Sequence, residues 1–423
     1  MPHNTRYPSP SSASTGRSHH SSSSTSYHYS PVQQTVTINR PNVPDFRFCM
    51  ELGLVLRSRT LDHKESAGLE KELSRTLTKQ NIPNSVITSS LKQTSSSSSS
   101  SYAVQVLDSP SSREWTITTE ASIPDHAKDH RFGIKLVSPF MRFTATKHES
   151  WLKKIYTLFH VLEANFEVTS SHQCFTHIHI VPERGYWTYG QLECLAKSAL
   201  YFESCLDELV PPYRRKSVWA KSNRYNAYFG SAKSMRQCFD KFDKGGKLDI
   251  NGLAMRMNWC SANSATGLSL SEDGQDFMTD TYRWSFNGLV AQGGDGCGTV
   301  AFKQPPGSTS AEDAVGWVML VGCFARLACV LGETIRPEDK PLIKSLGEWL
   351  VYEASWCQLP RVKILKDLLR QAMPEMREVA GGSKGKGKDV EAITIDEDSR
   401  LRAKQGEREL VGEKYLRMLK HIH

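Results

Sequence analysis

Residues 314–331 form an almost wholly apolar run, and this run limits what the chain can fold into. A helix that crosses a membrane needs about 20 predominantly apolar residues. This run is shorter, contains Arg326, and comes directly after Ser310, Glu312 and Asp313. We therefore expect a helix that is buried at the centre of a globular domain, and we expect no membrane partner.

The cysteines and the start of the chain bear on the cellular compartment. The sequence has 10 cysteines, and none of them forms a C-x-x-C pair of the kind that zinc ribbons and thioredoxin-like sites use. No apolar signal segment follows Met1, and no Leu or Ile precedes Ile38 to build an amphipathic presequence helix. We expect reduced thiols and a cytoplasmic protein, with the nucleus as the alternative and the mitochondrion less favoured.

Low-complexity stretches divide the chain into parts. Residues 1–44 lack Asp and Glu and are rich in Ser, Thr and His, which is typical of a disordered leader. A Ser-rich insertion is predicted near residues 90–113, a flexible Gly- and Lys-rich linker at 377–398, and a charged helix at 399–423. The folded domain is therefore expected to span residues 45–376.

The spacing of apolar residues predicts both strands and helices. Strands are predicted at 46–56, 115–119, 132–137 and 175–181, with a hairpin formed by 282–290 and 299–303. Further helices are predicted at 65–79, after a capping box at Thr146, after Thr188 with a stripe that extends to Leu209, and at 338–355 and 360–373. This order predicts an α+β domain in which helices cover an antiparallel sheet.

Two carboxylates are candidate site residues. Glu51 lies in the apolar strand 46–56, and a buried carboxylate is costly unless it is paired or binds a metal. The alternative is a Glu on an edge strand that faces water. Glu120 ends the strand that begins at Trp115 and precedes Ser122, so it could ligate Mg²⁺ or hold a substrate amine, or simply mark a strand end.

Two histidines are also candidates, because they are two residues apart on a predicted strand. Strand alternation places His177 and His179 on the same face. Paired imidazoles can bind a metal or donate hydrogen bonds to phosphate oxygens. A hydrogen-bonded pair without such a role is the alternative.

The segment Tyr213–Phe229 interleaves aromatic and basic residues, and the chain has a net charge of +8. Such a pattern can bind single-stranded nucleic acid. A solvated basic loop is the favoured interpretation, so a nucleic-acid partner is not expected.

Six motifs, in this order, resemble the fungal amidoligase family, whose members are ATP-dependent carboxylate–amine ligases with a glutamine-synthetase-like fold. The resemblance runs from about Phe46 to about Leu331. The matching motifs are Phe48–Gly53, Trp115–Ser122, Gly133–Pro139, His177 with His179, Glu203–Arg215 and Gly298–Lys303.

The resemblance implies that ATP phosphorylates a carboxylate and that an amine displaces the phosphate to form an amide. The substrates would be small-molecule or peptide carboxylates and amines, and the cofactors ATP and Mg²⁺. Carried over to this sequence, the metal ligands are Glu51, Glu120 and His177. The catalytic residues are Glu51, Glu120 and Lys303, and the cofactor-binding residues are His177, His179, Arg215 and Lys303.

The sequence departs from the family pattern at several charged positions. Gly53, Lys135 and Ala301 stand where the pattern has Glu, and Lys303 stands where it has Arg. Each lost carboxylate removes an oxygen ligand for a metal. Two hypotheses follow: a working ATP-dependent ligase, or a degraded member that keeps the fold as a nucleotide-binding or scaffold module.

Overall fold

The structure is a computed structural model, and it describes most of the predicted domain. The described ranges are 43–87, 113–144, 151–243, 249–260, 277–278, 280–290, 298–332 and 334–372. The predicted leader (except Val43 and Pro44), the insertion up to residue 112, the capping box at Thr146, the linker and the C-terminal helix lie outside these ranges.

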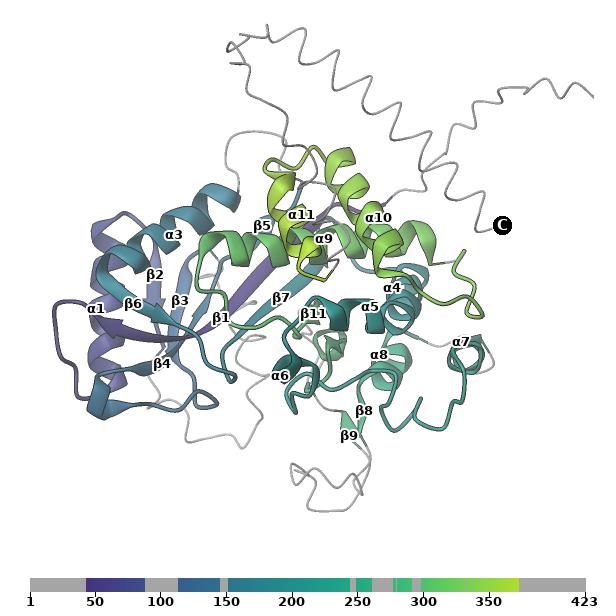
Figure 1. Cartoon of the computed structure of the whole chain (residues 1–423), viewed down its shortest axis with the longest axis horizontal. Coiled ribbons are helices and arrows are strands. Elements are labelled where there is room, and N and C mark those ends of the chain that lie inside the picture. Colours follow the sequence, from purple (N-terminus) through teal and green to yellow (C-terminus); the bar gives the residue numbers. More distant parts are fainter. Residues whose placement is uncertain are drawn as a thin grey trace, which may run out of the picture. The chain divides into compact units, whose positions relative to one another are not determined.

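Within the described ranges, nine strands form one sheet (Figure 1). Its main path runs β10-β11-β7-β1-β4-β3-β2, and β5 and β6 also pair with β1. The pairs are antiparallel except for β2–β3, which is parallel. The strands are β1 (Phe46–Ser58), β2 (Asn84–Val86), β3 (Trp115–Thr119), β4 (Phe132–Val137), β5 (Met141–Arg142), β6 (Phe166–Thr169), β7 (Phe175–Pro182), β10 (Trp284–Ser285) and β11 (Val300–Phe302). A separate ribbon pairs β8 (Trp259–Cys260) with β9 (Phe277–Met278).

Helices complete the domain and confirm the predicted α+β class with a largely antiparallel sheet. They are α1 (Ser66–Lys79), α3 (Trp151–Asn165), α4 (Tyr189–Tyr201), α5 (Glu203–Glu208), α6 (Pro212–Arg215), α7 (Met235–Asp243), α8 (Ile250–Asn258), α9 (Ala311–Leu331), α10 (Ile343–Trp356) and α11 (Val362–Arg370). The glutamine-synthetase-like fold implied by the resemblance stays a prediction.

The central helix α9 confirms the interpretation of the apolar run. It is long and apolar enough to cross a membrane, but 89% of its most apolar window is buried inside the protein. It contacts β1, β7 and four other helices. Gly322 allows the ring of Phe143 to approach, since a Cβ at this position would lie 2.3 Å from that ring. The charge of Arg326 is neutralised by Asp45 and Glu353.

The two faces of β1 have different surroundings. Met50, Leu52, Leu54 and Leu56 are fully buried on the face that packs under the helices. The same face includes Trp284, whose ring stacks on Phe324 of α9 with centroids 5.2 Å apart. The alternate residues of β1, from Cys49 to Val55, point to the opposite face, because successive side chains of a strand alternate.

Two differences from the predicted elements have simple physical causes. Thr188 and Gln191 form the expected capping box at the start of α4. The stripe predicted to continue to Leu209 is wrong as a single helix, because the chain turns at Phe202 and restarts as α5. Apolar spacing persists through such a turn, so it does not reveal the break.

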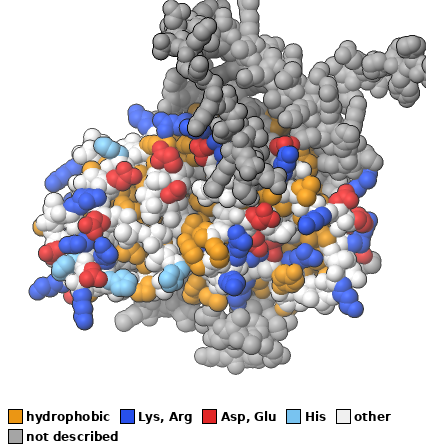
Figure 2. All heavy atoms as spheres, viewed as in Figure 1, with side chains coloured by type: hydrophobic (Ala, Val, Ile, Leu, Met, Phe, Trp, Pro, Cys, Tyr) orange, Lys and Arg blue, Asp and Glu red, His pale blue; other side chains and the backbone are white. Residues whose placement is uncertain are grey.

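The described surface has no single dominant sign of charge on the face seen in Figure 2. Lys and Arg side chains alternate there with Asp and Glu side chains and with hydrophobic patches.

Candidate functional site

A row of ionisable side chains crosses the sheet face that points away from α9. In antiparallel pairs, residues directly opposite each other have side chains on the same face. Glu51 lies opposite His177 on β7. Lys135 on β4 lies opposite Gly53, two residues along β1 from Glu51. We call this set the polar row; its members are Glu120, Lys135, Glu51, His177, His179, Asp280 and Lys303.

Glu51 is at the centre of the polar row. Its strand is central and its side chain is buried, so the alternative of an edge Glu that faces water is wrong. Its carboxylate lies 3.3 Å from His177 Nδ1 and 3.6 Å from His179 Nε2. Burial alone would raise the pKa of Glu51, but Lys135 and the two histidines hold it well below its usual value. Glu51 is therefore ionised in the folded protein.

His177 and His179 lie on one face, as the strand alternation predicts. Burial lowers the pKa of His177 to about 3, and Lys303 acts in the same direction against the hydrogen bond to Glu51. His177 is thus neutral near pH 7. The Nε2 atoms of both histidines are buried and have no hydrogen-bond partner in the described part of the chain. Buried polar atoms without a partner are rare, and they call for a physical explanation.

Lys135 connects Glu120 to the rest of the row. Its Nζ lies 3.5 Å from Glu120 Oε2, and both side chains are almost fully buried. The other oxygen of Glu120 accepts hydrogen bonds from the backbone N–H and hydroxyl of Ser122. Burial alone would lower the pKa of Lys135, but Glu51 and Glu120 raise it above its usual value. Lys135 therefore carries a positive charge between two carboxylates.

Gly53 leaves space that an aromatic ring fills. It lies opposite Phe175, and a Cβ on Gly53 would be 2.6 Å from the ring of Phe175. This ring also stacks on His177 with a centroid distance of 4.0 Å. The position where the family pattern has a second Glu is therefore closed by Phe175.

Lys303 occupies the other end of the polar row. Its ammonium forms a short ion pair with the Asp280 carboxylate and also donates to the backbone carbonyl of Asp280. Burial alone would raise the pKa of Asp280, but Lys303 and the hydroxyl of Ser285 lower it. Asp280 thus neutralises the cation that the sequence predicts for phosphate binding.

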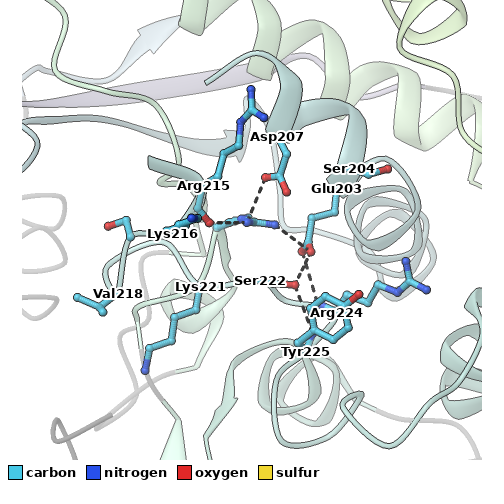
Figure 3. Close-up of a pocket in the computed structure, with 12 residues that line it drawn as sticks. Glu203, Ser204, Asp207, Arg215, Lys216, Val218, Lys221, Ser222, Arg224 and Tyr225 are labelled. Atoms are coloured by element: carbon cyan, nitrogen blue, oxygen red, sulfur yellow. Dashed lines mark hydrogen bonds and ion pairs between the residues drawn. The ribbon is translucent and has the colours of Figure 1, made fainter. Parts of the chain in front are cut away.

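Arg214 and Arg215 have different surroundings. The guanidinium of Arg214 is buried and donates to the backbone carbonyls of Lys303 and Gln304, at 2.7 and 2.9 Å. Burial lowers its pKa to about 10. Arg215, the predicted phosphate ligand, instead donates to the carbonyl of Val210 and lines a neighbouring cleft (Figure 3).

This cleft has a volume of about 480 Å³ and lies between α5 and the loop after α6 (Figure 3). Arg283 bridges Glu203 at 3.0 Å and Asp207 at 3.1 Å. Burial raises the pKa of both carboxyls, although Arg283 opposes it. The backbone carbonyl of Arg283 accepts from the N–H of Lys303, so the cleft adjoins the polar row.

The residues predicted to hold Mg²⁺ do not fit this ion. Mg²⁺ demands near-octahedral coordination, chiefly by oxygen. The ammonium of Lys135 pairs with Glu120 at 3.5 Å and its charge also acts on Glu51, and His177 offers nitrogen. In the described ranges, no group of three or more His, Cys, Asp or Glu side chains is placed to hold a metal ion.

The structure thus brings some predicted site residues together and separates others. Glu51, His177 and His179 are in contact, whereas Glu120 joins them only through Lys135. Sequence reasoning missed Asp280 and Arg283, which complete the charge pairing, and Arg214, which donates to the backbone carbonyl of Lys303. Strand parity could have indicated Arg283, which is two residues before Ser285. Asp280 lies in a loop without a periodic pattern, so no local signal indicates it.

Comparison with known proteins gives one family. A family model described as "Putative amidoligase enzyme" matches residues 63–324, which is more than half of the chain. The match contains the polar row except Glu51, which precedes it on β1. No curated protein matches the chain.

Proposed function

This chain belongs to the amidoligase family, and on that premise we propose that its polar row is a ligand-binding site that no longer supports ATP-dependent ligation. The observation that carries this proposal is that charged groups that a ligase of this kind would use, a carboxylate and a phosphate-binding lysine, are already paired within the protein. Lys135 pairs with Glu120, and Lys303 pairs with Asp280.

Binding of a metal–triphosphate would require breaking these pairs. A carboxylate that ligates Mg²⁺ must give up its ammonium partner, and a lysine that binds phosphate must give up its carboxylate. Removing one partner of a buried ion pair costs about 3–5 kcal/mol, because the other charge is left uncompensated. Arg283 is engaged in the same way by Glu203 and Asp207.

The unpartnered atoms support a role in ligand binding. His177 is neutral, and its Nδ1 side faces Glu51, so its Nε2 is available to accept a hydrogen bond. A buried polar atom without a partner costs about 1–3 kcal/mol. A small ligand with an amine or hydroxyl donor would remove that penalty at His177 Nε2 and could reach Glu51 Oε1, which lies 3.6 Å from His179 Nε2.

Two measurements on the full chain test the proposal. We expect no release of ADP from Mg-ATP with mixtures of small carboxylates and amines, and no rise of the melting temperature with Mg-ATP. Release of ADP that disappears in Glu51→Gln would overturn the proposal. A melting shift by Mg-ATP without turnover would favour a nucleotide-binding module and would place the ligand at phosphate-binding groups instead.

A working ligase is the second candidate, and one observation favours it. Lys135 and the histidines hold Glu51 ionised although it is buried, which a catalytic base or a ligand-binding carboxylate requires. In that case Glu51 and Glu120 would act on the substrates, and Lys303 and Arg215 on phosphates. The substrates would be small-molecule or peptide carboxylates and amines.

A further inference from the structure

The geometry points to Lys135 as a built-in cation, whose ammonium takes the place of a divalent metal ion between Glu51 and Glu120. The inference concerns the charge balance of the polar row. It rests on the proposed function only in taking the polar row as the functional site. It holds whether or not the protein catalyses ligation.

The position of Lys135 supports this inference first. Its Nζ is 3.5 Å from Glu120 Oε2, and its side chain is only 9% exposed. Lys135 lies on β4, and strand alternation puts its side chain on the same face of the sheet as Glu51 of the neighbouring strand β1. A buried carboxylate pair requires a compensating positive charge, since two uncompensated charges in a low-dielectric interior repel each other strongly.

The pairing of Gly53 with Lys135 supports it independently. These two residues lie directly opposite each other in the β1–β4 register. The resemblance to the family implies Glu at both positions, and this sequence has a glycine and an ammonium there. Phe175 fills the space beside Gly53, so no carboxylate returns there without displacing this ring.

The other groups that face the two carboxylates are a hydroxyl, a backbone N–H and two imidazoles. Glu120 accepts two hydrogen bonds from Ser122, and Glu51 faces His177 and His179. Lys135 is the ammonium whose charge acts on both carboxylates, and it pairs directly with Glu120. A divalent cation next to Glu51 and Glu120 would be repelled by the positive charge of Lys135, which opposes its binding.

Removing this ammonium should create a metal site. We expect the wild-type chain to show no change of melting temperature with MgCl₂, MnCl₂ or CaCl₂ at constant ionic strength. Lys135→Gln should melt at a lower temperature, and divalent cations should restore part of the loss. Its affinity for Mn²⁺, measured by calorimetry, should exceed that of the wild type by about tenfold or more, since an opposing charge has been removed.

Lys303→Gln is the matched control. Lys303 is also a buried lysine of the polar row, but among the described residues it forms an ion pair with Asp280 only. This variant should also lose stability, yet divalent cations should not restore it, because one carboxylate is a poor site for a hard cation. Equal rescue of both variants would overturn the inference, since it would indicate a general effect of cations.

Other outcomes also test whether Lys135 replaces a metal ion. Mn²⁺ binding by the wild type that raises its melting temperature would overturn the inference, as would a Lys135→Gln variant that responds to metal no more than the wild type. If Lys135→Gln fails to fold, its refolding yield with Mn²⁺ is compared with that in NaCl of equal ionic strength. Rescue by Mn²⁺ alone supports the inference, and no rescue refutes it.

These results are separable from those for the proposed function. Metal-independent ADP release by the wild type would refute the loss of ligation and leave the role of Lys135 intact. Metal binding by the wild type without ADP release would refute the role of Lys135 and leave the loss of ligation intact.

Discussion

The two faces of the central sheet are built on different principles. On the face under α9, residues such as Leu52 and Ile178 are fully buried among other apolar side chains. On the opposite face, Glu51, Lys135 and Lys303 are also buried, but each lies within 4 Å of a group of complementary charge or a hydrogen-bond donor.

The comparison shows that equal burial has unequal consequences. Apolar burial stabilises roughly in proportion to area, and it tolerates exchange of similar side chains. Burial of charge stabilises only when each partner is present, so the polar row depends on pairs. The apolar face should therefore dominate stability, whereas the polar row should dominate pH and ligand dependence.

The largest expected effect is on the apolar face. Leu52→Ala should lower the free energy of unfolding by about 3–5 kcal/mol, because it removes a fully buried side chain and leaves a cavity under the helices. Urea denaturation followed by tryptophan fluorescence measures this. Val55→Ala on the opposite face is the control and should cost less, since a smaller side chain is removed. Equal losses of unfolding free energy in the two variants would contradict the proposed difference between the faces.

Breaking one pair of the polar row should have the next largest effect. Lys303→Gln or Asp280→Asn alone should cost about 2–3 kcal/mol, somewhat less than for a fully buried pair because the Asp280 side chain is 19% exposed. The double variant should lose less than the sum of the two, as seen in a double-mutant cycle of denaturation midpoints. Strict additivity would show that the two groups are not coupled.

A smaller effect should appear as a pH dependence. The folded pKa of His177 is lowered to about 3, so the unfolded chain takes up a proton near pH 6.5 while the folded chain does not. Stability is therefore fully present above that pH and falls as the pH decreases, by at most about 1.4 kcal/mol per pH unit.

His177→Gln should flatten this decrease between about pH 6.5 and 5, above the range where carboxylates dominate. The measurement is the melting temperature of both proteins across this range. His160→Gln, at an exposed position of α3, is the matched control and should keep the wild-type slope. A variant at His177 that keeps the full slope would show that other groups cause it.

The smallest effect is expected for an ion pair outside both faces. Arg370 and Asp367 pair on the exposed surface of α11, one turn apart. Arg370→Ala should cost about 0.5 kcal/mol or less, because water screens exposed pairs. A loss in denaturation experiments as large as that for Lys303→Gln would remove the distinction between buried and exposed pairs.

Much of the secondary structure could be predicted from the sequence. The bounds of β3 and β4 agree with the predicted strands, and α9 agrees with the predicted buried helix. These elements have strong local patterns: β-branched residues in the strands, and a long apolar run in the helix. The break between α4 and α5 could not be predicted, because the same apolar spacing continues across Phe202.

The candidate site could be predicted only in part. Strand alternation placed His177 and His179 together, and Glu51 was recognised as an acid in an apolar strand. Asp280 was missed, because its pairing with Lys303 joins a loop to a strand end and leaves no local pattern. Arg215 was chosen over Arg214 by motif position, but the fold turned Arg214 toward Lys303.

By itself, the sequence determined that this chain has a buried central helix and a sheet with carboxylates and histidines on its strands. Local spacing and residue type are sufficient for these features. Only the tertiary structure decided that Gly53 faces Lys135, that Phe175 fills the gap, and that Lys135 pairs with Glu120 on the same sheet face as Glu51. Register between strands far apart in sequence depends on how whole elements pack, and that register decides which charges meet.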